Sequence, residues 1–93
     1  MKSIYTVKPT TRFRKDYKLM EKRNYNMSLL DEIITKLAQG IPLPASNRDH
    51  ALTGNYAGHR ECHITPDWLL VYRFEENILV LSLTRTGSHS DLF

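Results

Sequence analysis

Residues 60–84, RECHITPDWLLVYRFEENILVLSLT, decide the fold because they contain three β-strand patterns in close succession. Residues 60–65 alternate between polar and apolar side chains, residues 68–74 are almost wholly apolar, and residues 78–84 are rich in leucine and β-branched residues. The joints at 66–67 and 75–77 are too short for a crossover helix, so neighbouring strands must run antiparallel. The stretch therefore predicts a three-strand antiparallel meander.

Upstream of this stretch, the sequence predicts one strand and two helices. Residues 4–7 are β-branched or aromatic and precede a proline, which is typical of a short strand. Apolar residues then recur at helical spacing over residues 10–23, where Thr10 and Thr11 can cap a helix. A second helix is expected to open at Asn26 or Ser28. The apolar positions expected to face the sheet are Phe13, Tyr17 and Met20 in the first helix and Met27, Leu30, Ile34 and Leu37 in the second.

The remaining segments connect or end these elements. Gly40 is well placed to terminate the second helix, and residues 41–56 hold prolines, a glycine and other turn formers, so a long surface loop is expected there. Residues 85–93 form a polar tail that ends on two apolar residues. The order strand, helix, helix and three strands predicts a single α+β domain over residues 1–93, with both helices packed on one face of the sheet.

Length and composition exclude several classes of protein. Ninety-three residues suffice for one domain, and 41% hydrophobic with 25% charged residues are ordinary globular values. The single cysteine, Cys62, excludes an internal disulfide and a cysteine-based zinc cluster. The longest apolar run, residues 68–72, is too short to span a bilayer, and no signal-peptide pattern follows the basic N-terminus. We therefore expect a soluble, cytoplasmic protein without a membrane partner.

Positive charge is concentrated at the start of the chain. Residues 1–23 contain eight basic side chains against two acidic ones, whereas the rest of the chain is net acidic. A polyanion such as a nucleic acid would bind this segment, because each phosphate that the segment neutralises releases counterions. A solvated helix face would have the same composition, so both interpretations stay open. The basic positions of the first helix that lie off its apolar face are Arg12, Arg14, Lys15 and Lys18.

Chemically active side chains occur where strands end or loops begin. They are His50 in the loop, His63 on the first meander strand, Asp67 and Trp68 at the next turn, Arg85 at the end of the last strand and His89 in the tail. This set of side chains fits the requirements of RNA cleavage without a metal. That reaction needs a base to take the proton of the ribose 2′-hydroxyl, a cation to stabilise the phosphorane and an acid to protonate the leaving 5′-oxygen. Imidazole suits both proton transfers because its ordinary pKa of about 6.5 lies near neutrality.

Most of these side chains also have a purely structural interpretation. A histidine can be a surface or hydrogen-bonded structural residue, and Asp67 after a proline can be a turn residue. Trp68 at the start of a strand can belong to the core. Arg85 can pair with a carboxylate of the tail such as Asp91.

Two further alternatives concern cysteine and metal chemistry. Strand alternation places Cys62 on the face opposite His63, where a small buried hydrophobe is expected instead of a nucleophile. A zinc site of His50, His63 and Asp67 is an alternative, although no ligand spacing such as H-x-x-x-H occurs. His59 beside Gly58 is expected to be an ordinary loop residue.

Two long motifs point to a family. Residues 60–72, RECHITPDWLLVY, and residues 83–93, LTRTGSHSDLF, resemble the YafQ family of bacterial toxins, which belongs to the RelE superfamily of toxin–antitoxin modules. The resemblance covers essentially the whole chain and includes the basic helix and the loop DHAL at residues 49–52. The helical half alone would not identify the family.

The resemblance implies a RelE-like fold and a ribosome-dependent endoribonuclease that cuts messenger RNA in the ribosomal A site and arrests translation without a metal or other cofactor. Within this pattern we choose His89 as the general acid and His50 or Asp67 as the base, and we expect Arg85 to hold the scissile phosphate. His63 would position groups or share the proton transfers, and Trp68 and Phe93 would hold or stack bases. The positions that match the family's active-site pattern are His50, His63, Asp67, Trp68, Arg85, His89 and Phe93.

The resemblance also implies a cognate antitoxin in a hetero-oligomer, with an acidic or amphipathic segment around the helices, and operator DNA bound by the toxin–antitoxin complex. The alternative is a non-catalytic module that binds nucleic acid or the ribosome through the basic helix alone. A module that only binds would not require imidazoles and an arginine that converge from a loop, a strand and the tail. A third interpretation is a protein whose helices only bind another chain. It overlaps with the toxin interpretation, because an antitoxin must cover some of this surface.

Overall fold

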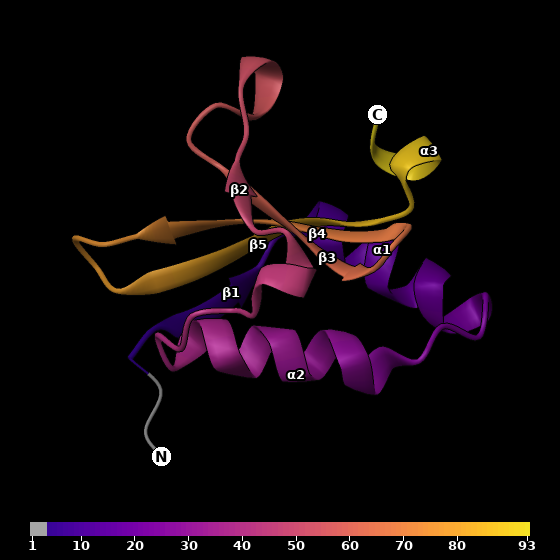
Figure 1. The fold of residues 1–93 in the computed structure, drawn as a ribbon, viewed down its shortest axis with the longest axis horizontal. Coiled ribbons are helices and arrows are strands. Elements are labelled where there is room, and N and C mark those ends of the chain that lie inside the picture. The colour runs from indigo at the N-terminus through magenta and orange to yellow at the C-terminus, as the bar shows by residue number, and fades with distance from the viewer. Residues whose placement is uncertain (1–3) are drawn as a thin grey trace.

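The three strands predicted within residues 60–84 form the centre of the sheet in the computed structural model, which describes residues 4–93 (Figure 1). β3 (Arg60–Thr65) pairs antiparallel with β4 (Trp68–Glu75), and β4 pairs antiparallel with β5 (Val80–Gly87). The predicted meander is therefore confirmed.

The third strand differs from its predicted bounds of 78–84. β4 continues to Glu75, which pairs with Val80, so residues 76–79 form the turn. Leu79 takes a left-handed conformation there, with a φ of 51°, and the N–H of Ile78 donates to the carbonyl of Glu75. Because the strand starts later and runs to Gly87, Arg85 lies inside it. An apolar run contains no signal for which of its residues will turn.

A parallel strand forms one edge of the sheet. β1 (Thr6–Pro9) pairs with β5, and Thr6 lies opposite Val80. The strand begins later than the predicted residues 4–7, because the N–H groups of Ile4 and Tyr5 both donate to the carbonyl of Ala38. The full strand order is β1-β5-β4-β3-β2.

The other edge lies in the segment predicted to be a plain loop, and that prediction was wrong in part. β2 (His50–Ala51) pairs antiparallel with β3. Two 3₁₀ turns flank it, η1 (Ala45–Asn47) and η2 (Gly54–Tyr56). A strand of two residues and single helical turns are too short to produce a recognisable period in the sequence.

Both predicted helices are present and cover the same face of the sheet (Figure 1). α1 (Thr11–Lys22) follows Thr10, whose hydroxyl accepts the N–H of Phe13 at 3.0 Å. α2 (Met27–Ala38) follows Asn26, and Gly40 beyond its end has a φ of 71°. The buried residues between the helices and the sheet are Phe13, Met20, Leu30, Ile33, Leu37, Ala38, Cys62, Trp68, Leu70, Tyr72, Leu81 and Leu83.

The opposite face of the sheet carries the C-terminal segment (Figure 1). α3 (His89–Leu92) packs there through Leu92, which contacts Leu69 and Val71. The predicted polar tail is thus the end of a strand followed by a short helix. Its signal in the sequence is a capping box, in which the side chains of Ser88 and Asp91 each accept a backbone N–H of the other residue.

Within residues 4–93, no helix combines the length and the apolar character that crossing a membrane requires.

We expect Leu70→Ala to lower the free energy of unfolding by about 3 kcal/mol, because a fully buried leucine is replaced by a cavity in the central strand. Urea denaturation measures this change. Ile78→Ala is the matched control, since Ile78 is 66% exposed at the turn before β5, and it should change stability by less than about 0.5 kcal/mol. Equal effects at the two positions would contradict the described core.

Candidate active site

Three histidines meet around one buried carboxylate on the sheet face that carries α3. Glu61 and His63 lie two residues apart on β3 and share a face, and β2 places His50 opposite Glu61. An Oε1 atom of Glu61 lies 3.6 Å from Nε2 of His50 and 3.7 Å from Nε2 of His63. The Glu61 side chain is only 6% exposed, so its carboxylate forms the buried centre of this cluster.

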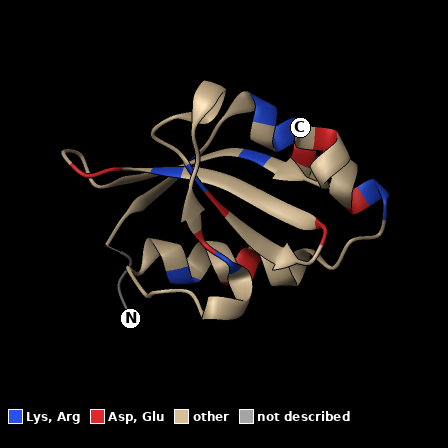
Figure 2. Ribbon diagram, turned by 45° about the horizontal axis from the view of Figure 1, so that its top comes forward, with Lys and Arg blue, Asp and Glu red and all other residues tan. Residues whose placement is uncertain are grey.

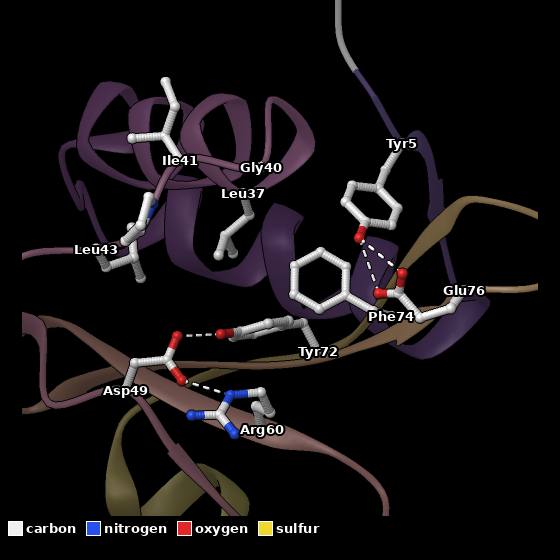
Figure 3. A pocket seen from close by; sticks show the side chains of 11 residues that line it. Tyr5, Leu37, Gly40, Ile41, Leu43, Asp49, Arg60, Tyr72, Phe74 and Glu76 are labelled. Carbon is white, nitrogen blue, oxygen red and sulfur yellow. Dashed lines mark hydrogen bonds and ion pairs between the residues drawn. The ribbon is translucent and has the colours of Figure 1, made fainter.

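Local backbone structure fixes the orientation of His50. Its Nδ1 lies 2.7 Å from the carbonyl of Arg48, and since a carbonyl only accepts, Nδ1 carries the hydrogen. Asp49 anchors the segment by accepting hydrogen bonds from the hydroxyl of Tyr72 and from Nε of Arg60, as Figure 3 shows beside an apolar cavity. The pKa of Tyr72 is raised, first by burial and then by this bond to Asp49. His50 therefore presents Nε2 toward Glu61.

His89 is brought to the same place from the other end of the chain. Its ring centroid lies 5.7 Å from that of His63, and its Nδ1 lies 3.1 Å from Oδ1 of Asp67 in the turn between β3 and β4. The backbone N–H of His89 also donates to Oδ1 of Asp67. Hydrogen bonds from His89 hold the pKa of Asp67 below its usual range. Asp67 is thus an anionic acceptor that leaves Nε2 of His89 free.

The short helix that carries His89 is held by an ion pair. Asp91 accepts hydrogen bonds from Nη1 of Arg23 at 2.8 Å and from Nη2 at 3.3 Å, and it also accepts from the backbone and the hydroxyl of Ser88. The Arg23 guanidinium, followed by the bonds from Ser88, lowers the pKa of Asp91 to about 2. α3 is therefore tied to the end of α1.

Arg85 is bound to a buried carboxylate of α1. Its Nε donates to Oδ2 of Asp16 at 2.7 Å and its Nη2 to Oδ1 at 3.2 Å, and the N–H of Thr86 donates to the same carboxylate. These bonds raise the pKa of Arg85, with Asp16 as the main cause. The alternative pairing of Arg85 with Asp91 is wrong, because Asp91 binds Arg23.

The two aromatic residues expected to hold bases have different environments. Phe93 is 63% exposed, and its ring packs edge-on against Tyr56 with the centroids 5.8 Å apart. Trp68 is only 2% exposed, donates its indole N–H to the hydroxyl of Thr86 and packs against Tyr25. The assignment of Trp68 as a base-stacking residue is therefore corrected: the indole belongs to the core, because a tryptophan at the start of a buried strand reaches between the sheet and the helices.

Cys62 has no nucleophilic character in this fold. The side chain is fully buried in the main core, and burial raises the pKa of its thiol to about 12. This agrees with the expectation of a small buried hydrophobe.

The basic residues singled out in the first helix are exposed along α1. Figure 2 shows the lysine and arginine positions as blue bands on that helix. The exposed set consists of Arg12, Arg14, Lys15 and Lys18. The exposure allows a polyanion to contact them and equally fits a solvated face.

The described residues include one group with metal-ligand geometry. Glu61, His63 and His89 place ligand atoms within 4.8 Å of one another. This group differs from the zinc set considered for the sequence, in which His50 and Asp67 accompanied His63. Asp67 instead accepts hydrogen bonds from His89.

Sequence reasoning found Asp67 but missed two other acidic residues that organise the site, Glu61 and Asp16. Glu61 could have been found from strand alternation, because it lies two positions before His63. Asp16 could have been found from helical spacing, because it lies on the buried face of α1 between Phe13 and Met20. The partner of Asp16, Arg85, is distant in sequence, so spacing alone could not identify that pair.

Comparison with known proteins assigns this chain to the bacterial toxins of type II toxin–antitoxin systems. The chain belongs to the YafQ family, whose model matches residues 5–93. It is 40% identical over 82 residues to the mRNA interferase toxin YafQ of Escherichia coli K12, covering 87% of each chain.

Solved structures agree with this assignment. In the Escherichia coli DinJ–YafQ complex, the matched chain has a TM-score of 0.87 and 37% identity, with 96% of this chain and 98% of that chain covered. A metal-bound toxin from Helicobacter pylori has a TM-score of 0.90 and 39% identity, with 96% and 99% covered. The RelE-like α+β fold predicted from the sequence is confirmed.

We expect the stabilising effect of Asp91 to disappear in acid. Its pKa in the folded protein is about 2, below the ordinary value of 3.8, so ionised Asp91 stabilises the fold above pH 4 and this contribution is lost as the pH falls toward 2. The difference in free energy of unfolding between the wild type and Asp91→Asn should therefore shrink between pH 5 and pH 2.5 in urea titrations. Glu32→Gln, at an exposed position of α2, is the control. A difference that does not change with pH would contradict the ion pair.

Proposed function

We propose that this chain is the toxin of a type II toxin–antitoxin module and a ribosome-dependent endoribonuclease, which cuts messenger RNA in the ribosomal A site and thereby inhibits translation. The observation that carries the proposal is the meeting of His50, His63 and His89 around Glu61 and Asp67 on one sheet face. Three imidazoles from three separate segments serve proton transfer, whereas a module that only binds a polyanion would need cations alone. Membership of the YafQ family supports the same activity.

We assign the general acid to His89. Asp67 accepts the hydrogen on Nδ1, which fixes the ring and leaves Nε2 to protonate the leaving 5′-oxygen. This arrangement resembles the orienting carboxylate of a catalytic triad. The lowered pKa of Asp67 makes it a weak base and favours this orienting role over proton abstraction.

We assign the general base to His50, with His63 sharing the proton transfers. Nε2 of His50 faces Glu61, whose buried carboxylate would stabilise the imidazolium that forms when the ring takes the 2′-hydroxyl proton. The oxygen released from its proton then attacks the neighbouring phosphorus, and a 2′,3′-cyclic phosphate forms as the 5′-oxygen leaves with the proton of His89. No metal is required, because imidazoles move both protons.

Cationic and aromatic groups would hold the substrate. Arg85 uses Nε and Nη2 on Asp16, and its remaining N–H groups would bind the scissile phosphate. Exposed Phe93 would stack on a base. The exposed basic residues of α1 would contact the backbone of ribosomal RNA or mRNA. This basic set is Arg12, Arg14, Lys15 and Lys18.

The partners follow from family membership and from charge. We propose a cognate antitoxin that forms a hetero-oligomer with this chain, as DinJ does with YafQ in their solved complex. An acidic or amphipathic antitoxin segment would complement the basic surface of α1. The toxin–antitoxin complex would bind operator DNA, chiefly through the antitoxin, and the chain would act in the cytoplasm, where its ribosomal target lies.

We expect expression of this chain alone to arrest growth by stopping translation and expression of His89→Gln to leave growth unchanged. Glutamine keeps hydrogen-bonding capacity but cannot deliver a proton, so mRNA cleavage on purified ribosomes should slow by about 10²–10⁴-fold. Primer extension and end-group analysis measure the cleavage. Wild-type products should end in a 2′,3′-cyclic or 3′-phosphate, and cleavage should persist when free metal is chelated and ribosome integrity is maintained separately.

Several results would oppose the proposal. Normal growth with folded wild-type protein accumulating would favour the non-catalytic binding module. Products with a 3′-hydroxyl and a 5′-phosphate would indicate a metal-activated water. Full cleavage by folded His89→Gln would transfer the acid role to His63 or His50. The melting temperature of the variant, measured alongside, separates lost chemistry from lost folding.

We expect simultaneous charge reversal at Arg12, Arg14, Lys15 and Lys18 to weaken ribosome association and to reduce its dependence on salt, because fewer counterions are released. All four side chains are exposed, so the fold should persist by circular dichroism. Co-sedimentation with ribosomes at several salt concentrations measures the effect. Unchanged association would identify this surface as a solvated face or an antitoxin surface.

A further inference from the structure

The position of His89 depends on very little regular structure. α3 has four residues, so it has almost no internal hydrogen bonding with which to hold its own orientation. Nevertheless His89 must lie 3.1 Å from Asp67 and with its ring 5.7 Å from that of His63. Contacts outside α3 must therefore fix the rotation of this helix over the sheet.

Besides the hydrogen bonds of His89 to Asp67 and the packing of Phe93 on Tyr56, two contacts of different kinds attach α3 to the rest of the molecule. Leu92 is buried against Leu69 and Val71, and this apolar contact is not directional. Asp91 makes the directional contact. Its Oδ2 accepts the N–H of Ser88 at 2.9 Å and Nη1 of Arg23 at 2.8 Å.

The geometry around Asp91 leaves it little freedom. A Cβ atom on Gly87 would lie 2.9 Å from Cβ of Asp91, so the strand passes directly against this side chain. On the other side, Arg23 is the residue that ends α1, and its backbone N–H donates to the carbonyl of Leu19 at 3.1 Å. The guanidinium thus extends from a fixed helix end and donates a hydrogen bond to each carboxylate oxygen of Asp91.

We infer that Arg23 and Asp91 are positioning residues, which set the rotation of α3 and thereby hold the His89 ring against Asp67 and beside His63. Neither residue touches the substrate in this scheme, and both act through His89. The inference rests on the proposed function, because it assigns to these residues the geometry of the proposed general acid. Without the pair, Leu92 would still keep α3 on the sheet, but only the hydrogen bonds to the exposed carboxylate of Asp67 would remain to orient the imidazole.

The principal test compares Arg23→Met with Lys22→Met. Both remove one positive charge near the end of α1, but only Arg23 contacts Asp91. In mRNA cleavage on purified ribosomes, Arg23→Met should lower kcat about 10- to 100-fold with KM within twofold, since a misplaced catalytic group costs rate and not binding. Lys22→Met should leave both constants unchanged. Arg23→Lys keeps the charge without the two-pronged contact and should recover part of kcat.

Two further measurements separate positioning from general stability. The double variant Arg23→Met with Asp91→Ala should be no slower than the slower single variant, because the two residues act as one unit. Nuclear Overhauser contacts between the rings of His63 and His89 should be present in the wild type and in Lys22→Met and lost in Arg23→Met. Circular dichroism should show that all of these variants are folded at the assay temperature.

The outcomes distinguish the inference from the proposed function. A wild-type chain that does not cleave mRNA would contradict the proposed function, and the ring contacts would then decide the positioning role alone. If the wild type cleaves and Arg23→Met matches Lys22→Met in kcat, the inference is overturned. Retention of the His63–His89 contacts in Arg23→Met would overturn it as well.

Discussion

The burial of β4 on both faces is the constraint on which the rest of the molecule depends. Five consecutive residues, Trp68–Tyr72, are at most 2% exposed, and strand alternation sends them in turn to opposite sides of the sheet. One side requires α1 and α2 as a cover, and the other requires the C-terminal segment and η2. The C-terminal segment and η2 are short, so the side chains that lie beyond them on this face stay exposed to solvent. The histidines are gathered on this thinly covered side because Glu61 and His63 occupy the corresponding face of β3.

The catalytic arrangement that we propose takes its three imidazoles from separate segments and fixes the orientation of each ring. His50, His63 and His89 come from a short edge strand, a central strand and a short helix. In each case Nδ1 contacts an oxygen, which is the carbonyl of Arg48, the carbonyl of Pro66 and the carboxylate of Asp67 respectively. Nδ1 is therefore the donor atom in all three rings, and Nε2 is the atom available for chemistry.

The parts of this structure that were predictable from sequence are those with a local period. The meander, the two helices and the burial of Cys62 follow from alternation or helical spacing. The start of β5 was missed because Leu79 turns within an apolar run, and α3 was missed because its signal is a cap and not a period. Trp68 shows the limit of motif reasoning, since the residue matches an active-site pattern and yet lies in the core. The ion pairs of Asp16 and Asp91 join residues about seventy positions apart, and only the folded chain brings them together.

The parallel pairing of β1 with β5 has a consequence for the order of folding. Every other strand pair joins segments that are close in sequence, but both helices and the strands β2, β3 and β4 separate Thr6 from Val80 along the chain. Closing so long a loop costs chain entropy before any contact compensates for it, so this edge forms late and is the slow step of assembly. The same step brings α1 onto β5 and engages Asp16 with Arg85. During biosynthesis the molecule therefore passes through a stage in which its β-meander is complete while Arg85 still lacks Asp16 as its partner.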